Sequence, residues 1–277
     1  MNPVRKPDTF GNAAWRILLL PALLSTTLFV LPARANDGAV NIPSGTILPV
    51  RLNSTLTSQK AKPGQVITGR IMQDVPLPSG ERIREGSKVI GHIVEVTPAN
   101  NGAQARVSLQ FDKLVSSHQT IAITTNLRAI AGFVGVQEAE TPTTSRGEGD
   151  GAHRMTTEQV GGDVVYGTNA PVTTNEHSDD VVGKGVYGGV LGQIRAKEGT
   201  ECRGPIDGNN NPQALWVFSS DACGVYRLHH ISIVRAGRTD PMGVIVLASD
   251  QNNLKITEGA GMLLRVTGSS HALTASR

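Results

Sequence analysis

Apolar and polar side chains alternate along two blocks of the chain, residues 39–132 and residues 181–268. Alternation with period two, rich in β-branched residues and interrupted by Gly, Pro, Asn and Ser, is typical of short β-strands joined by turns. The pattern predicts strands over residues 46–52, 65–72, 88–96, 105–114 and 120–125, and within 181–196, 224–237, 243–249, 254–256 and 261–268. No stretch after residue 35 has convincing helical periodicity, so we expect a mainly β chain.

Residues 137–180, which make up most of the interval 133–180 between the two blocks, are polar, rich in Gly and Thr, and nearly free of large apolar side chains. Such a segment buries too little apolar area to offset the entropy of ordering its backbone. Only residues 164–166 have a composition that suits a strand. We therefore predict two small β-barrel or β-sandwich domains, joined by a flexible polar linker, with residues 269–277 as a disordered tail.

The pattern Ile-x-x-Gly occurs three times, and a predicted strand follows each copy. The copies begin at Ile42, Ile83 and Ile256 and end at Gly45, Gly86 and Gly259. The isoleucine can anchor the turn in a core, while glycine adopts the backbone conformation that β-branched residues avoid. The repeat therefore predicts a common turn at the entry to three strands.

Residues 1–35 have the organisation of an export signal that precedes the two blocks. Basic residues end at Arg16, an apolar stretch follows, and a small-x-small triplet ends at Ala35, after which we expect cleavage. The stretch has only about 15 residues and contains Pro21, whereas a helix that spans a bilayer needs about 20. A cleaved leader is therefore favoured over a retained anchor. The mature chain would then be exported to the periplasm, the outer-membrane surface or the extracellular space.

The formal net charge of +3 is located in this leader. Residues 1–35 carry four basic side chains and one acidic one, and the remainder has equal numbers of the two kinds. Nucleic-acid binding needs a concentrated positive surface, so it is not expected of the mature chain. No later stretch is long and apolar enough to be an integral membrane segment.

The two cysteines, Cys202 and Cys223, are expected to form a disulfide, because disulfides persist in oxidising compartments. A loop of this size would stabilise the fold by about 3 kcal/mol. The alternative is a metal site that joins both thiols to His229 and His230. The gap between the cysteines lacks the paired C-x-x-C spacing of zinc sites, so no metal is predicted.

No catalytic residues or cofactor can be assigned from the sequence, which lacks a G-x-S-x-G nucleophile motif. The candidate ligand-binding residues are Trp216, Asp207, Asp221 and His229. Trp216 is the only tryptophan after the leader, and it suits either a core aromatic or a platform on which a ligand stacks. The acidic and histidine side chains could alternatively belong to a secreted hydrolase with its site in the C-terminal block.

Residues 42–125 contain the ordered series IPSGTILPVRLNSTL, GQVITGRIMQDV, IREGSKVIGHIVEV and ARVSLQFDKL. This series resembles the β-barrel core of the conjugal-transfer scaffold proteins of type IV secretion. The C-terminal half resembles no family of known activity. The export signal, this barrel-like strand series and the absence of a recognisable reaction centre together favour a non-enzymatic assembly or binding module of the cell envelope, with an envelope protein or a glycan as its partner.

Overall fold

The computed structural model describes residues 41–100, 103–116, 119–145, 154–195 and 211–268, and these residues are mainly β. The predicted leader and the predicted C-terminal tail lie outside the described residues. The described residues, all of them between 41 and 268, belong to one compact unit. Within the described part of this unit, no helix has the length and apolar character needed to cross a membrane.

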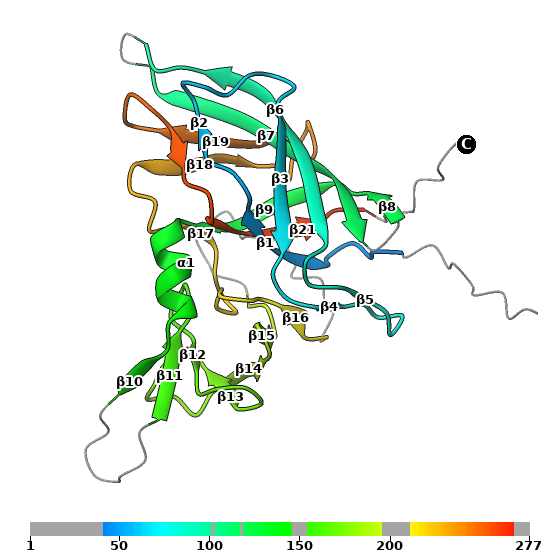
Figure 1. The fold of residues 1–277 in the computed structure, drawn as a ribbon, viewed down its shortest axis with the longest axis vertical. Coiled ribbons are helices and arrows are strands. Elements are labelled where there is room, and N and C mark those ends of the chain that lie inside the picture. The colour runs from blue at the N-terminus through cyan, green and yellow to red at the C-terminus, as the bar shows by residue number, and fades with distance from the viewer. Residues whose placement is uncertain (1–40, 101–102, 117–118, 146–153, 196–210, 269–277) are drawn as a thin grey trace, which may run out of the picture. The chain divides into compact units, whose positions relative to one another are not determined.

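The described residues contain one helix and 21 strands (Figure 1). The helix α1 covers Phe133–Glu140. The strands are β1 (Ile47–Leu52), β2 (Leu56–Thr57), β3 (Val66–Ile71), β4 (Val75–Pro76), β5 (Arg82–Ile83), β6 (Lys88–Thr97), β7 (Ala105–Ser116), β8 (Gln119–Ala122), β9 (Thr125–Ala131), β10 (Thr143–Ser145), β11 (Arg154–Glu158), β12 (Val164–Val165), β13 (Pro171–Thr173), β14 (Val181–Val186), β15 (Gly189–Gly192), β16 (Gln213–Ala214), β17 (Gly224–Tyr226), β18 (Ile231–Ala236), β19 (Ile245–Ser249), β20 (Lys255–Ile256) and β21 (Gly261–Val266).

The strands predicted at residues 46–52, 65–72, 88–96 and 105–114 are present as β1, β3, β6 and β7, and the three turns of the Ile-x-x-Gly repeat are confirmed as well. The predicted strand at residues 120–125 instead spans the break between β8 and β9. The three isoleucines of the repeat are buried. Gly45, Gly86 and Gly259 have φ angles of 92°, 84° and 86°, and they precede β1, β6 and β21. Glycine adopts such positive φ angles without the steric cost that a side chain would add.

Strands of both blocks belong to one ten-stranded sheet, in the order β17-β9-β21-β1-β3-β6-β7-β19-β18, with β8 paired to β7. Strand β21 lies between β1 and β9, and β19 lies between β7 and β18. The structure thus differs from the expected pair of separate domains, because the C-terminal strands complete the sheet that the N-terminal strands begin. The path is open, since β17 and β18 at its ends are not paired, so no closed barrel is formed.

The segment expected to be a flexible linker is largely folded where the structure describes it. Strands β10 to β16 form a second, seven-stranded antiparallel sheet. The predicted strand at residues 164–166 is present as β12, and its neighbours β11 and β13 come from the same segment. Helix α1 was not expected. Its N-cap residue, Gly132, has no side chain to cap it, and the burial of Val136 and Ala139 supplies the tertiary packing that stabilises so short a helix.

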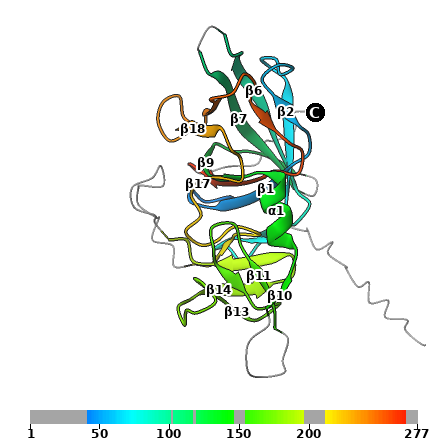
Figure 2. The ribbon, with the colours of Figure 1, turned by 90° about the vertical axis from the view of Figure 1, so that its left-hand side faces the viewer.

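Two hydrophobic clusters form the core of the protein, and one of them packs the two sheets against each other. The larger lies within the ten-stranded sheet and includes Phe111 and Leu109. The smaller joins side chains of β1, β9 and β21 to side chains of α1, the seven-stranded sheet and the turn after β16. In Figure 2, β1 lies next to the seven-stranded sheet with α1 beside both. Single valines of the polar segment, such as Val160 and Val172, enter this second cluster, which is why composition alone underestimated its order.

Candidate binding groove beside helix α1

Trp216, the aromatic candidate from the sequence, lies in the turn after β16 and is only 3% exposed. Its ring packs edge-on against Phe218, with the ring centroids 6.4 Å apart. The residue has a positive φ of 51°, which is uncommon for a bulky side chain. Trp216 is therefore a core aromatic, and it does not offer a free face on which a ligand could stack.

The other candidates do not come together around Trp216. Asp221 is half-buried and His229 is exposed, and no hydrogen bond or ion pair joins them within the described part of the chain. Ser219 is fully buried, and its hydroxyl donates to the carbonyl of Val160 at 2.8 Å. Asp207 lies outside the described residues.

The predicted disulfide stays a prediction, because Cys202 lies outside the described residues. Cys223 is buried, and its backbone N–H donates to the hydroxyl of Tyr226 at 2.9 Å. His230, a partner in the alternative metal site, pairs instead with Asp250, with 3.0 Å between Nδ1 and Oδ1. Among the described residues, no group of three or more His, Cys, Asp or Glu side chains is placed to hold a metal ion.

The charge of Asp221 influences two buried ionisable side chains, Arg128 and Asp163. Burial and the nearby Arg238 lower the pKa of Arg128 to about 10, and Asp221 opposes this shift. Burial raises the pKa of Asp163, whose Oδ2 accepts the N–H of Ser220 at 2.7 Å. Arg128 donates to the carbonyl of Arg195 at 2.5 Å, so its guanidinium ties β9 to the chain after β15.

Two glutamines hold the unusual backbone of Trp216. The side-chain Oε1 of Gln73 accepts the N–H of Trp216 at 2.7 Å, and the side-chain Nε2 of Gln159 donates to the carbonyl of Trp216 at 2.8 Å. Gln73 also pairs with both backbone groups of Val190 in β15, at 3.1 Å and 2.8 Å. Because Gln73 follows β3, its amide joins the two sheets, and no sequence pattern indicated this role.

Arg51 in β1 covers the indole ring of Trp216, with the guanidinium carbon 5.0 Å from the ring centroid. Its Nη2 also donates to Oε1 of Glu140, at the end of α1. A cation over an aromatic face and a carboxylate on the same guanidinium both restrict its motion. The side chain is still 25% exposed, so a fixed cation reaches the surface at this point.

The surface at Arg51 is a groove between α1 and the ends of β1 and β3, with about 530 Å³ of space for water. We call it the α1 groove. Its lining combines charged and apolar side chains, including Arg51, Arg70, Phe133, Val136, Gln137 and Glu258. Phe133, the first residue of α1, is 44% exposed despite its size. The volume falls in the range of binding sites for small ligands or peptide side chains.

A second groove follows the other side of α1 and is lined by Glu138, Glu158 and Tyr226, among others. The one basic side chain in its lining, Arg227, already pairs with Glu138 at 3.1 Å. This groove therefore offers a ligand no unpaired basic side chain, in contrast to the α1 groove.

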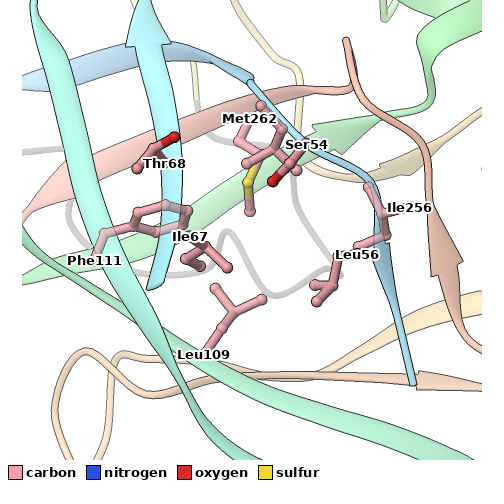
Figure 3. Close-up of a pocket in the computed structure, with 9 residues that line it drawn as sticks. Ser54, Leu56, Ile67, Thr68, Leu109, Phe111, Ile256 and Met262 are labelled. Atoms are coloured by element: carbon pink, nitrogen blue, oxygen red, sulfur yellow. The ribbon is translucent and has the colours of Figure 1, made fainter. Parts of the chain in front are cut away.

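An apolar cavity lies inside the ten-stranded sheet, where Ile67, Leu109 and Met262 point toward one another (Figure 3). It has only about 10 Å³ of space for the centre of a water-sized sphere, about what one water molecule requires. The cavity is therefore a small packing gap in the core, too small to bind a larger ligand.

No protein-family model and no curated protein matches this chain.

Proposed function

We propose that this chain is an exported, non-enzymatic binding or assembly module of the bacterial cell envelope. The leader pattern of residues 1–35 supports export, and the ordered motifs of residues 42–125, which resemble conjugal-transfer scaffold proteins, support an envelope role. The partner would be an envelope protein or a glycan. Its docking place on the chain would be the α1 groove.

The observation that carries this proposal is that the α1 groove combines an immobilised arginine, Arg51, with an exposed aromatic ring, Phe133. Arg51 is held by Trp216 and Glu140, and Trp216 is in turn held by buried glutamines. The exposed ring of Phe133 lies at the same groove. Binding surfaces concentrate their energy in aromatic and arginine side chains that need little ordering when the partner arrives.

A photocrosslinking experiment in the native bacterium tests the proposal. A photoreactive phenylalanine analogue replaces Gln137 in the α1 groove, and the same analogue replaces the exposed Gln251 as the matched control. The full chain is produced, and the mature protein is recovered from the envelope fraction. We expect one defined adduct from position 137, none from position 251, and a mature N-terminus at Asn36.

Two results would overturn the proposal. Equal adducts from both positions, or none from position 137, would show that the groove has no specific partner. A protein that stays in the cytoplasm with an intact Met1 would contradict export.

A further inference from the structure

Two arginines stand directly opposite each other on neighbouring strands at the floor of the α1 groove. Arg51 in β1 is the register partner of Arg70 in β3. Like charges at directly opposed positions destabilise a sheet unless another charge compensates them. Glu140 compensates Arg51, whereas the side chain of Arg70 is exposed and makes no hydrogen bond or ion pair with any residue that the structure describes. One guanidinium of the groove thus lacks a counter-charge.

The apolar side of the same groove is also in place before a ligand binds. Gly259 lies directly under Phe133, since a Cβ built at position 259 would be only 2.6 Å from Cδ2 of the ring. The ring therefore rests on the backbone at this glycine while remaining 44% exposed. A ligand that satisfied Arg70 could cover Phe133 at the same time, because both line the groove.

We propose that the α1 groove binds an extended peptide segment of the partner in which a carboxylate side chain lies next to an apolar one. The carboxylate pairs with Arg70 through the two-pronged geometry that guanidinium groups favour. The neighbouring apolar side chain packs on Phe133. This inference rests on the proposed function, since it names the kind of partner that the α1 groove recognises.

The charges of the groove favour a carboxylate over a phosphate. Glu140 and Glu258 also line it, so a group with two negative charges would approach two carboxylates. A single negative charge matches the one unpaired arginine, Arg70. A second negative charge would find no further free arginine in the groove and would still be repelled by the two glutamates. Only one of the two acidic side chains, Glu140, is already paired with an arginine.

A peptide titration followed by NMR tests the inference on the full chain. The probe is the tetrapeptide Gly-Phe-Glu-Gly, blocked at both ends so that the glutamate provides its only charge. Matched peptides replace Glu by Gln, Glu by phosphoserine, or Phe by Ala. The variants are Arg70→Gln and, as the control, Arg106→Gln at an exposed position of β7.

We expect the Glu peptide to bind the unaltered chain and Arg106→Gln equally, with shifts at Arg70 and Phe133. Replacing Glu by Gln should weaken binding about tenfold, which is the value of one charge-assisted hydrogen bond. In Arg70→Gln, the Glu and Gln peptides should bind alike. The Ala peptide should bind more weakly than the Phe peptide in every protein.

Three outcomes would overturn the inference: no binding up to about 10 mM peptide, tighter binding of the phosphoserine peptide, or an Arg70→Gln variant that still prefers Glu. The proposed function would survive any of them if the photoreactive group at position 137 still captured its partner. Loss of that adduct from the unaltered groove would instead contradict the proposed function itself.

Discussion

The buried side-chain amide of Gln73 should make a large contribution to the unfolding free energy, although no sequence pattern indicates this. Its side chain is 1% exposed and accepts the backbone N–H groups of Val190 and Trp216. Methionine has a similar length and volume but cannot accept these bonds effectively, so Gln73→Met isolates the hydrogen bonds from the packing. The change leaves two N–H groups in a buried position with no acceptor.

The expected cost follows from the number of groups left unpaired. The carbonyl of Val190 keeps a second donor, the N–H of Leu215 at 2.9 Å, so it is not counted. At about 1–3 kcal/mol for each unsatisfied buried group, the two N–H groups together cost about 2–6 kcal/mol of unfolding free energy. With a urea slope of about 2 kcal/mol per M, the unfolding midpoint should fall by about 1–3 M.

Urea unfolding monitored by circular dichroism measures this loss, and Gln251→Met at an exposed loop position is the matched control. Hydrogen exchange adds a local readout, because the amides of Val190 and Trp216 should lose protection in Gln73→Met but not in the control. A loss below about 1 kcal/mol, together with unchanged protection of both amides, would refute the reasoning, since that cost is the lower limit for even one unpaired group.

Three further predictions concern the shared sheet, the buried acid and the cysteines. A fragment of residues 39–132 should show no cooperative unfolding alone and should gain it when the fragment of residues 181–268 is added, because β21 lies between β1 and β9; cooperative unfolding of the first fragment alone would contradict this. Because the pKa of Asp163 is raised in the folded chain, its contribution to stability is present at acid pH and is lost as the pH rises through that pKa. Asp163→Asn should therefore flatten the pH dependence of the urea midpoint, and at pH 7 the variant should be at least as stable as the unaltered chain. In exported protein, Cys202 and Cys223 should resist alkylation until a reductant is added, whereas two freely alkylated thiols would exclude the disulfide.

The local features of this fold could be predicted from the sequence. Alternating apolar residues located the strands of the first block, since successive side chains of a strand point to opposite faces. The three Ile-x-x-Gly copies identified Gly45, Gly86 and Gly259 as turn residues, and their positive φ angles confirm it. These features depend only on residues adjacent in the chain, which a single sequence displays directly.

The candidate site could not be predicted in the same way. Trp216 drew attention as the only tryptophan after the leader, but the surface above it is formed by Arg51, Arg70 and Phe133 from distant parts of the chain. Neither Gln73 nor Gln159, the two glutamines that hold Trp216, shows a sequence signal for this role. Their role follows from contacts across 143 and 57 positions of sequence.

Strand pairing and the order of the middle segment were decided only by the tertiary structure. Alternation shows which face of a strand is buried but not which strand lies beside it, so the interleaving of β21 and β19 with N-terminal strands left no local trace. The polar segment has too few apolar residues for a core of its own. It folds because Val160 and Val172 bury against residues such as Ile47 and Leu263 of the other sheet, an environment that exists only once distant strands have paired.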